Sequence, residues 1–233
     1  MSGKNESPEP HTFDIEVLDA ENPVACLIMG HGAGAGKEHV FMQDMAKALI
    51  AKGVSVVLFN FPYMQTIKAT GKRRPPDKAE KLLSHFIALI ESCCSDKETL
   101  NNLPVFVGGK SMGGRIATMV YEELGNVKGA IAFGYPFHPP GKPENTRTDH
   151  LLKACKPLLI IQGERDTFGT KAEVEGYGLP SSIECVFLED GDHSFKPRKA
   201  SGTTQQAHIV KAAELTATFI SGVLSNPRDD IKN

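Results

Sequence analysis

Short apolar runs alternate with longer amphipathic stretches along this chain of 233 residues, and this alternation constrains its fold most strongly. A continuous run such as Leu158-Leu159-Ile160-Ile161 is typical of a strand covered on both sides, as in a parallel sheet. The pattern therefore predicts an α/β fold whose sheet is mostly parallel and doubly wound, with about seven strands and helices on both faces. We expect strands at 13–18, 24–29, 54–59, 105–108, 127–133, 157–162 and 183–188, and helices at 37–52, 77–94, 112–124 and 205–224.

The segment between the fifth and sixth predicted strands is too short for a large lid domain. It is rich in proline and predicts a loop followed by a short helix into Leu152. We expect one α/β domain at 12–225, between a flexible polar N-terminus at 1–11 and a polar tail at 226–233. A site without a lid should be open to water.

The formal net charge is -2, which gives no electrostatic reason to expect a nucleic acid or an acidic membrane surface as partner. The basic run Lys72-Arg73-Arg74 favours a solvated loop, with a rim that attracts anionic substrates as the alternative. No apolar run reaches the length of a membrane span, and residues 1–10 lack the apolar core of a secretory signal.

The five cysteines are odd in number and scattered, which favours buried thiols in a reducing compartment and a cytoplasmic location. The chain has no Cys-x-x-Cys pair, and its eight histidines do not fall at metal-ligand spacing. We therefore expect neither a metal nor an organic cofactor. The sequence leaves the oligomeric state open.

The pentad Gly109-Lys110-Ser111-Met112-Gly113 follows a predicted strand and opens a predicted helix. A sharp strand-to-helix turn strains the backbone of its central residue, and side chains two positions away would clash, so glycines fit there. Ser111 would then lie at a helix N-terminus, where backbone N–H groups favour developing negative charge. We interpret the pentad as a nucleophile elbow with Ser111 as nucleophile, and a plain Ser/Gly turn is the alternative.

A serine hydroxyl needs a general base and a third group that orients the base. In an open α/β sheet, functional groups gather at the carboxyl ends of strands. Asp166 and His193 follow two later predicted strands, and the order Ser, Asp, His is that of α/β-hydrolases. Glu164 and Asp192 are alternative acids, although Asp192 adjoins His193 and reaches its ring poorly.

The glycine-rich loop at 30–36 follows the second predicted strand, where an oxyanion hole would draw one of its donors. We expect the backbone N–H of Met112 as one donor and that of Ala33 as the other, with Gly34 as the fallback. His31 is interpreted as a loop-shaping residue. The same loop matches a dinucleotide fingerprint, but the next strand ends at Phe59-Asn60 without the acidic residue that binds a ribose.

Across nearly the whole chain these motifs resemble the α/β-hydrolase superfamily. More narrowly, the loop with His31, the run 59–63, the elbow through Arg115, and Gln162-Gly163 with Asp166 look like the testis-expressed hydrolase-like group near the dienelactone hydrolases. The chain departs from dienelactone hydrolases proper by carrying serine in place of cysteine as nucleophile. The resemblance implies the fold, the triad and hydrolytic chemistry.

The residues and the resemblance together predict a serine hydrolase that acts on a small-molecule acyl substrate, a carboxylic ester or thioester, through an acyl-enzyme. The main alternative is a binding or scaffold protein that keeps the fold without turnover, because Lys110, Arg115 and Arg165 could either disturb or serve the site. A small peptidase and a nucleotide-binding protein are further alternatives.

Overall fold

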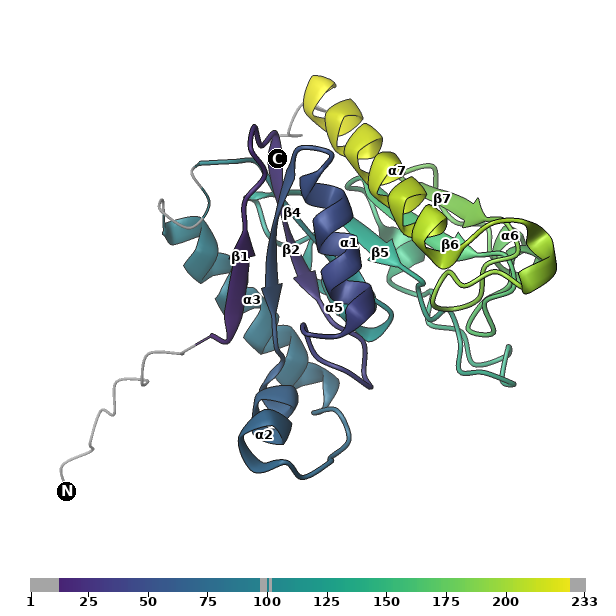
Figure 1. The fold of residues 1–233 in the computed structure, drawn as a ribbon, viewed down its shortest axis with the longest axis horizontal. Helices are drawn as coiled ribbons and strands as arrows, with labels where there is room; N and C mark the ends of the chain where they lie inside the picture. The colour runs from purple at the N-terminus through teal and green to yellow at the C-terminus, as the bar shows by residue number, and fades with distance from the viewer. Residues whose placement is uncertain (1–12, 97–99, 101, 227–233) are drawn as a thin grey trace.

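The computed structural model describes residues 13–96, 100 and 102–226, and within them seven strands form one sheet (Figure 1). The strand order is β1-β3-β2-β4-β5-β6-β7, with β1 antiparallel to β3 and every other neighbouring pair parallel. This confirms the predicted mostly parallel α/β sheet. The strands are β1 (Ile15–Leu18), β2 (Ala25–Gly30), β3 (Val54–Phe59), β4 (Val105–Lys110), β5 (Val127–Phe133), β6 (Leu158–Gly163) and β7 (Ile183–Leu188).

Helices cover both faces of this sheet, as a doubly wound fold requires. On β2, Leu27 and Met29 pack into one core with α1 (Val40–Ile50) and α7 (Gln205–Ser225), whereas Cys26 and Ile28 pack into the opposite core with α3 (Ala79–Ser95) and α5 (Met112–Val120). Successive strand residues face opposite sides, so a strand between two helical layers must be apolar at every position. That is why the central strands are continuous apolar runs.

Two short helices were not predicted from the sequence, α2 (Pro62–Thr70) and α6 (Lys171–Glu175). Helix α2 has a proline in its first turn and is capped at its C-terminus by Gly71, whose φ is +68°. It buries only Tyr63 and Met64, so its apolar periodicity is too weak to be read. Two predicted helices are shorter than expected, since α1 begins at Val40 and α5 ends at Val120.

Between β5 and β6 the chain forms a loop and one 3-10 turn, η1 (Leu151–Lys153), so no large lid domain covers the sheet. A second such turn, η2 (Lys199–Ser201), precedes α7. The predicted flexible N-terminus at 1–11 lies outside the described residues, as does the predicted tail beyond Asn226.

Helix α7 is long and apolar enough to cross a membrane by length and composition, which the sequence interpretation did not foresee. Its buried residues repeat along one face and pack into the core beside α1, as in the helix of a globular domain. They are His208, Ile209, Ala212, Ala213, Thr216 and Ile220.

Cys26 and Cys93 are buried thiols and Cys94 and Cys185 are half-buried, but Cys155 is exposed, contrary to the expectation of buried thiols. It lies just before β6, where the chain runs along the surface. The described residues hold no group of histidine, cysteine and acidic side chains that could bind a metal ion.

Candidate active site

Ser111 lies in the tight turn between β4 and α5, at the carboxyl edge of the sheet. Its backbone has φ +51° and ψ −113°, a strained conformation for a residue with a side chain. A Cβ added at Gly113 would lie 2.2 Å from the carbonyl oxygen of Gly30, and one added at Gly109 would lie 2.3 Å from the same oxygen. The two glycines of the pentad therefore let β2 approach the turn, as the sequence predicts.

Ser111, His193 and Asp166 form a continuous hydrogen-bonded chain. The Nε2 atom of His193 lies 2.9 Å from Oγ of Ser111, and its Nδ1 atom lies 2.8 Å from Oδ2 of Asp166. With Nδ1–H donating to the carboxylate, Nε2 carries a lone pair toward the serine hydroxyl and can accept its proton. The structure thus brings together three residues that lie far apart in the sequence.

Asp166 is fully buried directly after β6, and its carboxylate accepts three hydrogen bonds. Besides His193, the donors are the backbone N–H of Phe168 at 2.8 Å and Nε2 of Gln162 at 2.9 Å. The amide group of Gln162 also donates toward the carbonyl oxygens of Tyr135 and Gly169. These donors fix the carboxylate in its orientation toward the imidazole.

The two alternative acids have other partners. Glu164 accepts the backbone N–H of Asp190 at 3.0 Å, and Asp192 accepts the N–H groups of Ser194 and Lys196 in the turn around the histidine. Asp192 therefore shapes the loop of His193 but does not contact its ring. Of the three acids considered, Asp166 is the one hydrogen-bonded to the imidazole.

His193 is held from two further sides. The ring of Phe168 packs on the imidazole with centroids 4.3 Å apart, and Nζ of Lys110 donates to the backbone oxygen of His193 at 2.6 Å. Burial lowers the pKa of Lys110 to about 8, against the attraction of Asp166 and Asp192. Sequence reasoning named Lys110 only as a charge beside the site, because a contact across 83 positions leaves no local pattern.

The glycine-rich loop lies beside Ser111. A Cβ added at Gly32 would lie 3.8 Å from Cβ of Ser111, and the next two residues, Ala33 and Gly34, are exposed at the surface of the site. The hydroxyl of Tyr63 donates to the carbonyl oxygen of Ala33 at 2.9 Å. This bond anchors the loop to Tyr63 through the carbonyl group of Ala33.

His31 shapes this loop and is not part of the hydrogen-bonded chain. Its Nδ1–H donates to the carbonyl oxygen of Gly32 at 2.7 Å, and its Nε2 accepts the backbone N–H of Phe61 at 3.1 Å. Both ring nitrogens are therefore used, and burial lowers the pKa of His31 to about 4. The neutral ring ties the loop to the end of β3.

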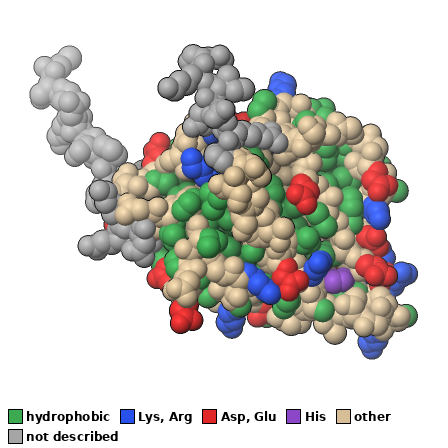
Figure 2. Space-filling model, turned by 90° about the horizontal axis from the view of Figure 1, so that it is seen from above, with side chains coloured by type: hydrophobic (Ala, Val, Ile, Leu, Met, Phe, Trp, Pro, Cys, Tyr) green, Lys and Arg blue, Asp and Glu red, His purple; other side chains and the backbone are tan. Residues whose placement is uncertain are grey.

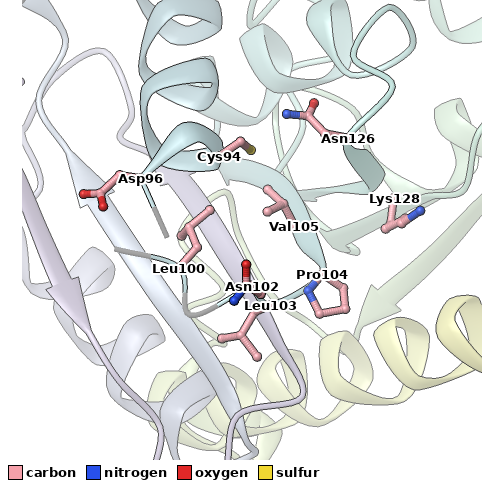
Figure 3. Close-up of a pocket in the computed structure, with 9 residues that line it drawn as sticks. All are labelled: Cys94, Asp96, Leu100, Asn102, Leu103, Pro104, Val105, Asn126 and Lys128. Atoms are coloured by element: carbon pink, nitrogen blue, oxygen red, sulfur yellow. The ribbon is translucent and has the colours of Figure 1, made fainter. Parts of the chain in front are cut away.

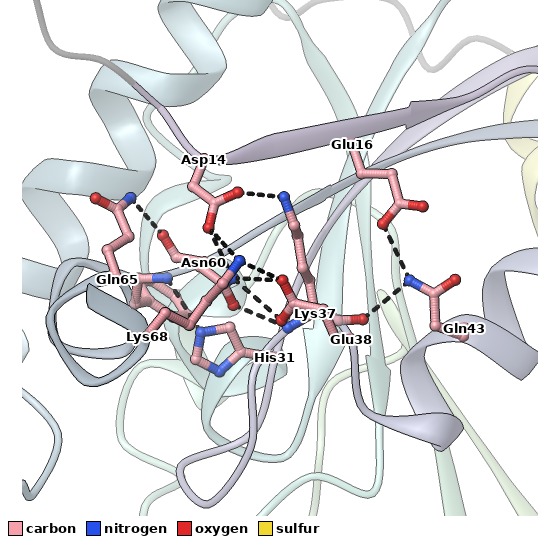
Figure 4. Close-up of polar contacts among 10 residues, drawn as sticks. Asp14, Glu16, His31, Lys37, Glu38, Gln43, Asn60, Gln65 and Lys68 are labelled. Carbon is pink, nitrogen blue, oxygen red and sulfur yellow. Dashed lines mark hydrogen bonds and ion pairs between the residues drawn. The ribbon is translucent and has the colours of Figure 1, made fainter. Parts of the chain in front are cut away.

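A polar network anchors the far end of the same loop (Figure 4). The side chain of Asn60 accepts the backbone N–H of Lys37 at 2.9 Å and donates to Asp14 at 2.9 Å, while Lys37 and Lys68 form ion pairs with Asp14. Burial alone would raise the pKa of Asp14, but hydrogen bonds from Asn60 and the two lysines hold it well below its usual range. The network holds the glycine-rich loop, which follows β2, against residues at the start of β1 and the end of β3.

A cavity of about 360 Å³ lies at the opposite edge of the sheet, before β4 and at the start of β5 (Figure 3). Cys94, Pro104 and Lys128 are among the residues that line it. Since Ser111, Asp166 and His193 follow the carboxyl ends of their strands, this cavity is a separate feature of the molecule.

Comparison with known proteins identifies the architecture. A family model described as an alpha/beta hydrolase domain matches residues 23–221. Dienelactone hydrolase from Anabaena variabilis has 18% sequence identity and a TM-score of 0.69, with 93% of this chain and 94% of that chain covered. Est1E from Butyrivibrio proteoclasticus, solved with ferulic acid bound, has 16% identity and a TM-score of 0.66, with 90% and 96% covered.

A third structure, XC6422 from Xanthomonas campestris, is described as an α/β serine hydrolase without a lid. It has 17% identity and a TM-score of 0.63, with 94% of this chain and 91% of that chain covered. At such low identities the structural likeness establishes a shared fold, with nearly the full length of each chain aligned.

Proposed function

Because this chain belongs to the alpha/beta hydrolase family, whose fold it shares, we propose that it is a serine hydrolase that cleaves a carboxylic ester or thioester. One observation carries the proposal, the hydrogen-bonded chain from Ser111 Oγ through His193 to the buried carboxylate of Asp166. A serine polarised in this way is suited to attack an acyl carbon.

In the first half of the reaction, Oγ of Ser111 attacks the carbonyl carbon while Nε2 of His193 takes the hydroxyl proton. Asp166 keeps the imidazole in the required tautomer and stabilises the imidazolium that forms. The carbonyl oxygen becomes an oxyanion, for which we assign the backbone N–H groups of Met112 and Ala33, with Gly34 as the alternative to Ala33. When the tetrahedral intermediate collapses, His193 returns the proton to the leaving alcohol or thiol.

Water completes the cycle by attacking the acyl-enzyme, with His193 again as general base, and the acid and free Ser111 are released. Water can reach the base for this step, since 24% of the His193 side chain is exposed. On this assignment, His193 is the base, Ser111 the nucleophile, and the backbone N–H groups of Met112 and Ala33 the oxyanion donors.

A fluorophosphonate probe, which reacts covalently with activated serines, tests the assignment. We expect wild-type protein to be labelled and Ser111→Ala to be silent, while Ser84→Ala, a change at an exposed serine of α3, labels like wild type. Equal labelling of Ser111→Ala and wild type would refute the role of Ser111.

A panel of esters and thioesters of graded acyl length then separates an enzyme from a scaffold that has only kept the fold. Turnover that depends on Ser111 supports the proposal. A folded wild-type protein that hydrolyses none of the panel and is not labelled would favour the scaffold.

A further inference from the structure

Beside the nucleophile, on the side of α5 and the loop after β5, three basic residues surround Tyr135. The hydroxyl of Tyr135 donates to the backbone oxygen of Arg147 at 2.8 Å and lies 3.4 Å from Nε2 of His150. Thr118 lies 3.0 Å from the same nitrogen and donates to the backbone oxygen of Arg115 at 2.8 Å. These contacts join the backbones of Arg115 and Arg147 and the ring of His150 around Tyr135, whose hydroxyl also hydrogen-bonds to the side chain of Arg115. All three basic residues are half-buried.

Asp149 acts on His150, but no carboxylate among the described residues pairs with the two arginines of this group. Within the part of the chain that the structure describes, neither Arg115 nor Arg147 forms an ion pair, and the buried Nε of Arg115 has no hydrogen-bond partner. Burial and the charge of Arg115 lower the pKa of Arg147, and the same two causes lower that of His150 to about 4. A half-buried arginine without a counter-ion is costly unless a ligand supplies one.

Several other basic residues among those described do have a carboxylate partner. On the face seen in Figure 2, basic and acidic side chains are mixed around the edge. Arg165 and Arg198 both pair with Asp190, and Lys52 pairs with Glu214 at 3.0 Å. Of the three half-buried arginines among the described residues, Arg165 therefore has a counter-ion, whereas Arg115 and Arg147 have none.

The arginine group lies close to Ser111. The backbone N–H of Arg115 donates to the carbonyl oxygen of Ser111 at 2.9 Å, so the two residues are one helical turn apart, a rise of about 6 Å. Helical side chains lean toward the helix N-terminus, which here is the serine end of α5. Tyr135 belongs to the same edge, since Gln162 donates to both its carbonyl oxygen and Asp166.

We propose that Arg115 and Arg147 bind a carboxylate on the acyl part of the substrate. The substrate class is then an ester or thioester whose acyl chain ends in a carboxylate a few bonds from the scissile carbonyl, as in a half-ester of a dicarboxylic acid. A guanidinium offers a planar pair of donors that matches a carboxylate, and half-burial strengthens the bond relative to water. This inference rests on the proposed function of Ser111.

The test compares glutaryl and valeryl substrates, which have acyl chains of the same length with and without a terminal carboxylate. Each is supplied as an ethyl ester and as an N-acetylcysteamine thioester, and the readout is the ratio of kcat/KM for glutaryl to that for valeryl. We expect wild type to favour glutaryl, and Arg115→Gln and Arg147→Gln each to lower the ratio about 10- to 100-fold, the range of a charge-assisted hydrogen bond.

Arg73→Gln is the matched control, because Arg73 is an exposed arginine of the basic run 72–74. Its ratio should equal that of wild type. The proposal is overturned if wild type shows no preference for glutaryl, if Arg115→Gln lowers both substrates equally, or if Arg73→Gln lowers the ratio as much as Arg115→Gln. The last outcome would assign the preference to attraction by the basic run.

A binding measurement separates failure of this inference from failure of the proposed function. In the Ser111→Ala background, free glutarate should raise the thermal midpoint, and Arg115→Gln should abolish that rise. Hydrolysis of valeryl substrates without a glutarate effect would leave the hydrolase standing and refute the arginine site. Glutarate binding that depends on Arg115, without hydrolysis of any substrate, would support the arginine site and refute the hydrolase.

Discussion

Replacing Lys110 by methionine should change how the stability of the fold depends on pH. The Lys110 side chain is buried between Ser111 and the loop that carries His193, with Nζ bonded to the backbone oxygen of His193 and 5.4 Å from the centroid of the Phe41 ring. An ammonium group loses hydration there, and burial lowers its pKa from 10.5 to about 8. The uncharged methionine chain has a similar length and no such cost.

The size and sign of the effect follow from proton linkage. A pKa lowered from 10.5 to about 8 corresponds to about 3 kcal/mol at 1.36 kcal/mol per unit. Between these values the unfolded chain binds more protons than the folded one, so wild-type stability rises with pH through this window. Below pH 8 the folded protein carries the full cost, and Lys110→Met removes it. Lys110→Met also loses the hydrogen bond to His193, which lowers the stability of the variant by the same amount at every pH.

Urea denaturation followed by far-UV circular dichroism at pH 7, 8, 9 and 10 measures the free energy of unfolding of both proteins. The advantage of Lys110→Met over wild type should shrink by about 2.5 kcal/mol between pH 7 and pH 10. Other lysines and the tyrosines titrate in both proteins, so they cancel in the difference. A difference that stays constant across this range would refute the argument that Lys110 is buried as a strained cation.

Three further predictions concern the site. Asp166→Asn should lower kcat/KM on a cleaved ester by about 10³- to 10⁴-fold and reduce stability in urea. The carboxylate of Asp166 accepts three hydrogen bonds with its two oxygens, whereas an asparagine side chain has a single acceptor oxygen. Unchanged kinetics would contradict this prediction. Gly113→Ala should lower the free energy of unfolding in urea by about 1 to 3 kcal/mol, since its Cβ meets a carbonyl oxygen at 2.2 Å. Gly222→Ala in α7, with open space around it, should instead raise the free energy of unfolding by about 0.5 to 1 kcal/mol. Wild type should lose stability as pH falls from 6.5 to 4, because the pKa of His31 in the folded protein is about 4 and the unfolded chain binds the proton first. His31→Gln should reduce that loss of stability by about 3 kcal/mol in urea denaturation. An identical dependence of stability on acid pH in both proteins would count against a buried neutral ring.

The sheet was predictable because strands buried on both faces leave continuous apolar runs, and each of the seven was placed within about two residues of its observed ends, the accuracy that such boundaries allow. Helix α2 was missed because it buries too few residues to show a period. The narrower resemblance to the testis-expressed group stays a prediction, since the family match establishes only the broader class.

The site divides in the same way. The order of Ser111, Asp166 and His193 could be read because each follows a strand end, and parallel strands bring those ends to one edge. The contacts that orient them could not be read. Gln162 is an ordinary strand residue in the sequence, and its bond to Asp166 depends on the path of the loop that follows β6.

The polar groups around the triad indicate that this edge of the sheet is optimised for something other than stability. Gln162 is fully buried, and its Oε1 has no partner, while its amide nitrogen faces three oxygens. Turning the amide round would point an oxygen at those oxygens, so the carboxylate of Asp166 fixes the orientation that leaves Oε1 unsatisfied. Lys110 and Arg115 add a buried cation and an unpaired guanidinium nitrogen along the same edge. Buried polar groups left in this state cost stability, so their concentration beside Ser111 fits the proposed hydrolase, whose reaction would require charge to be stabilised there. It follows that apolar replacements at these positions should raise the stability of the fold and at the same time lower turnover.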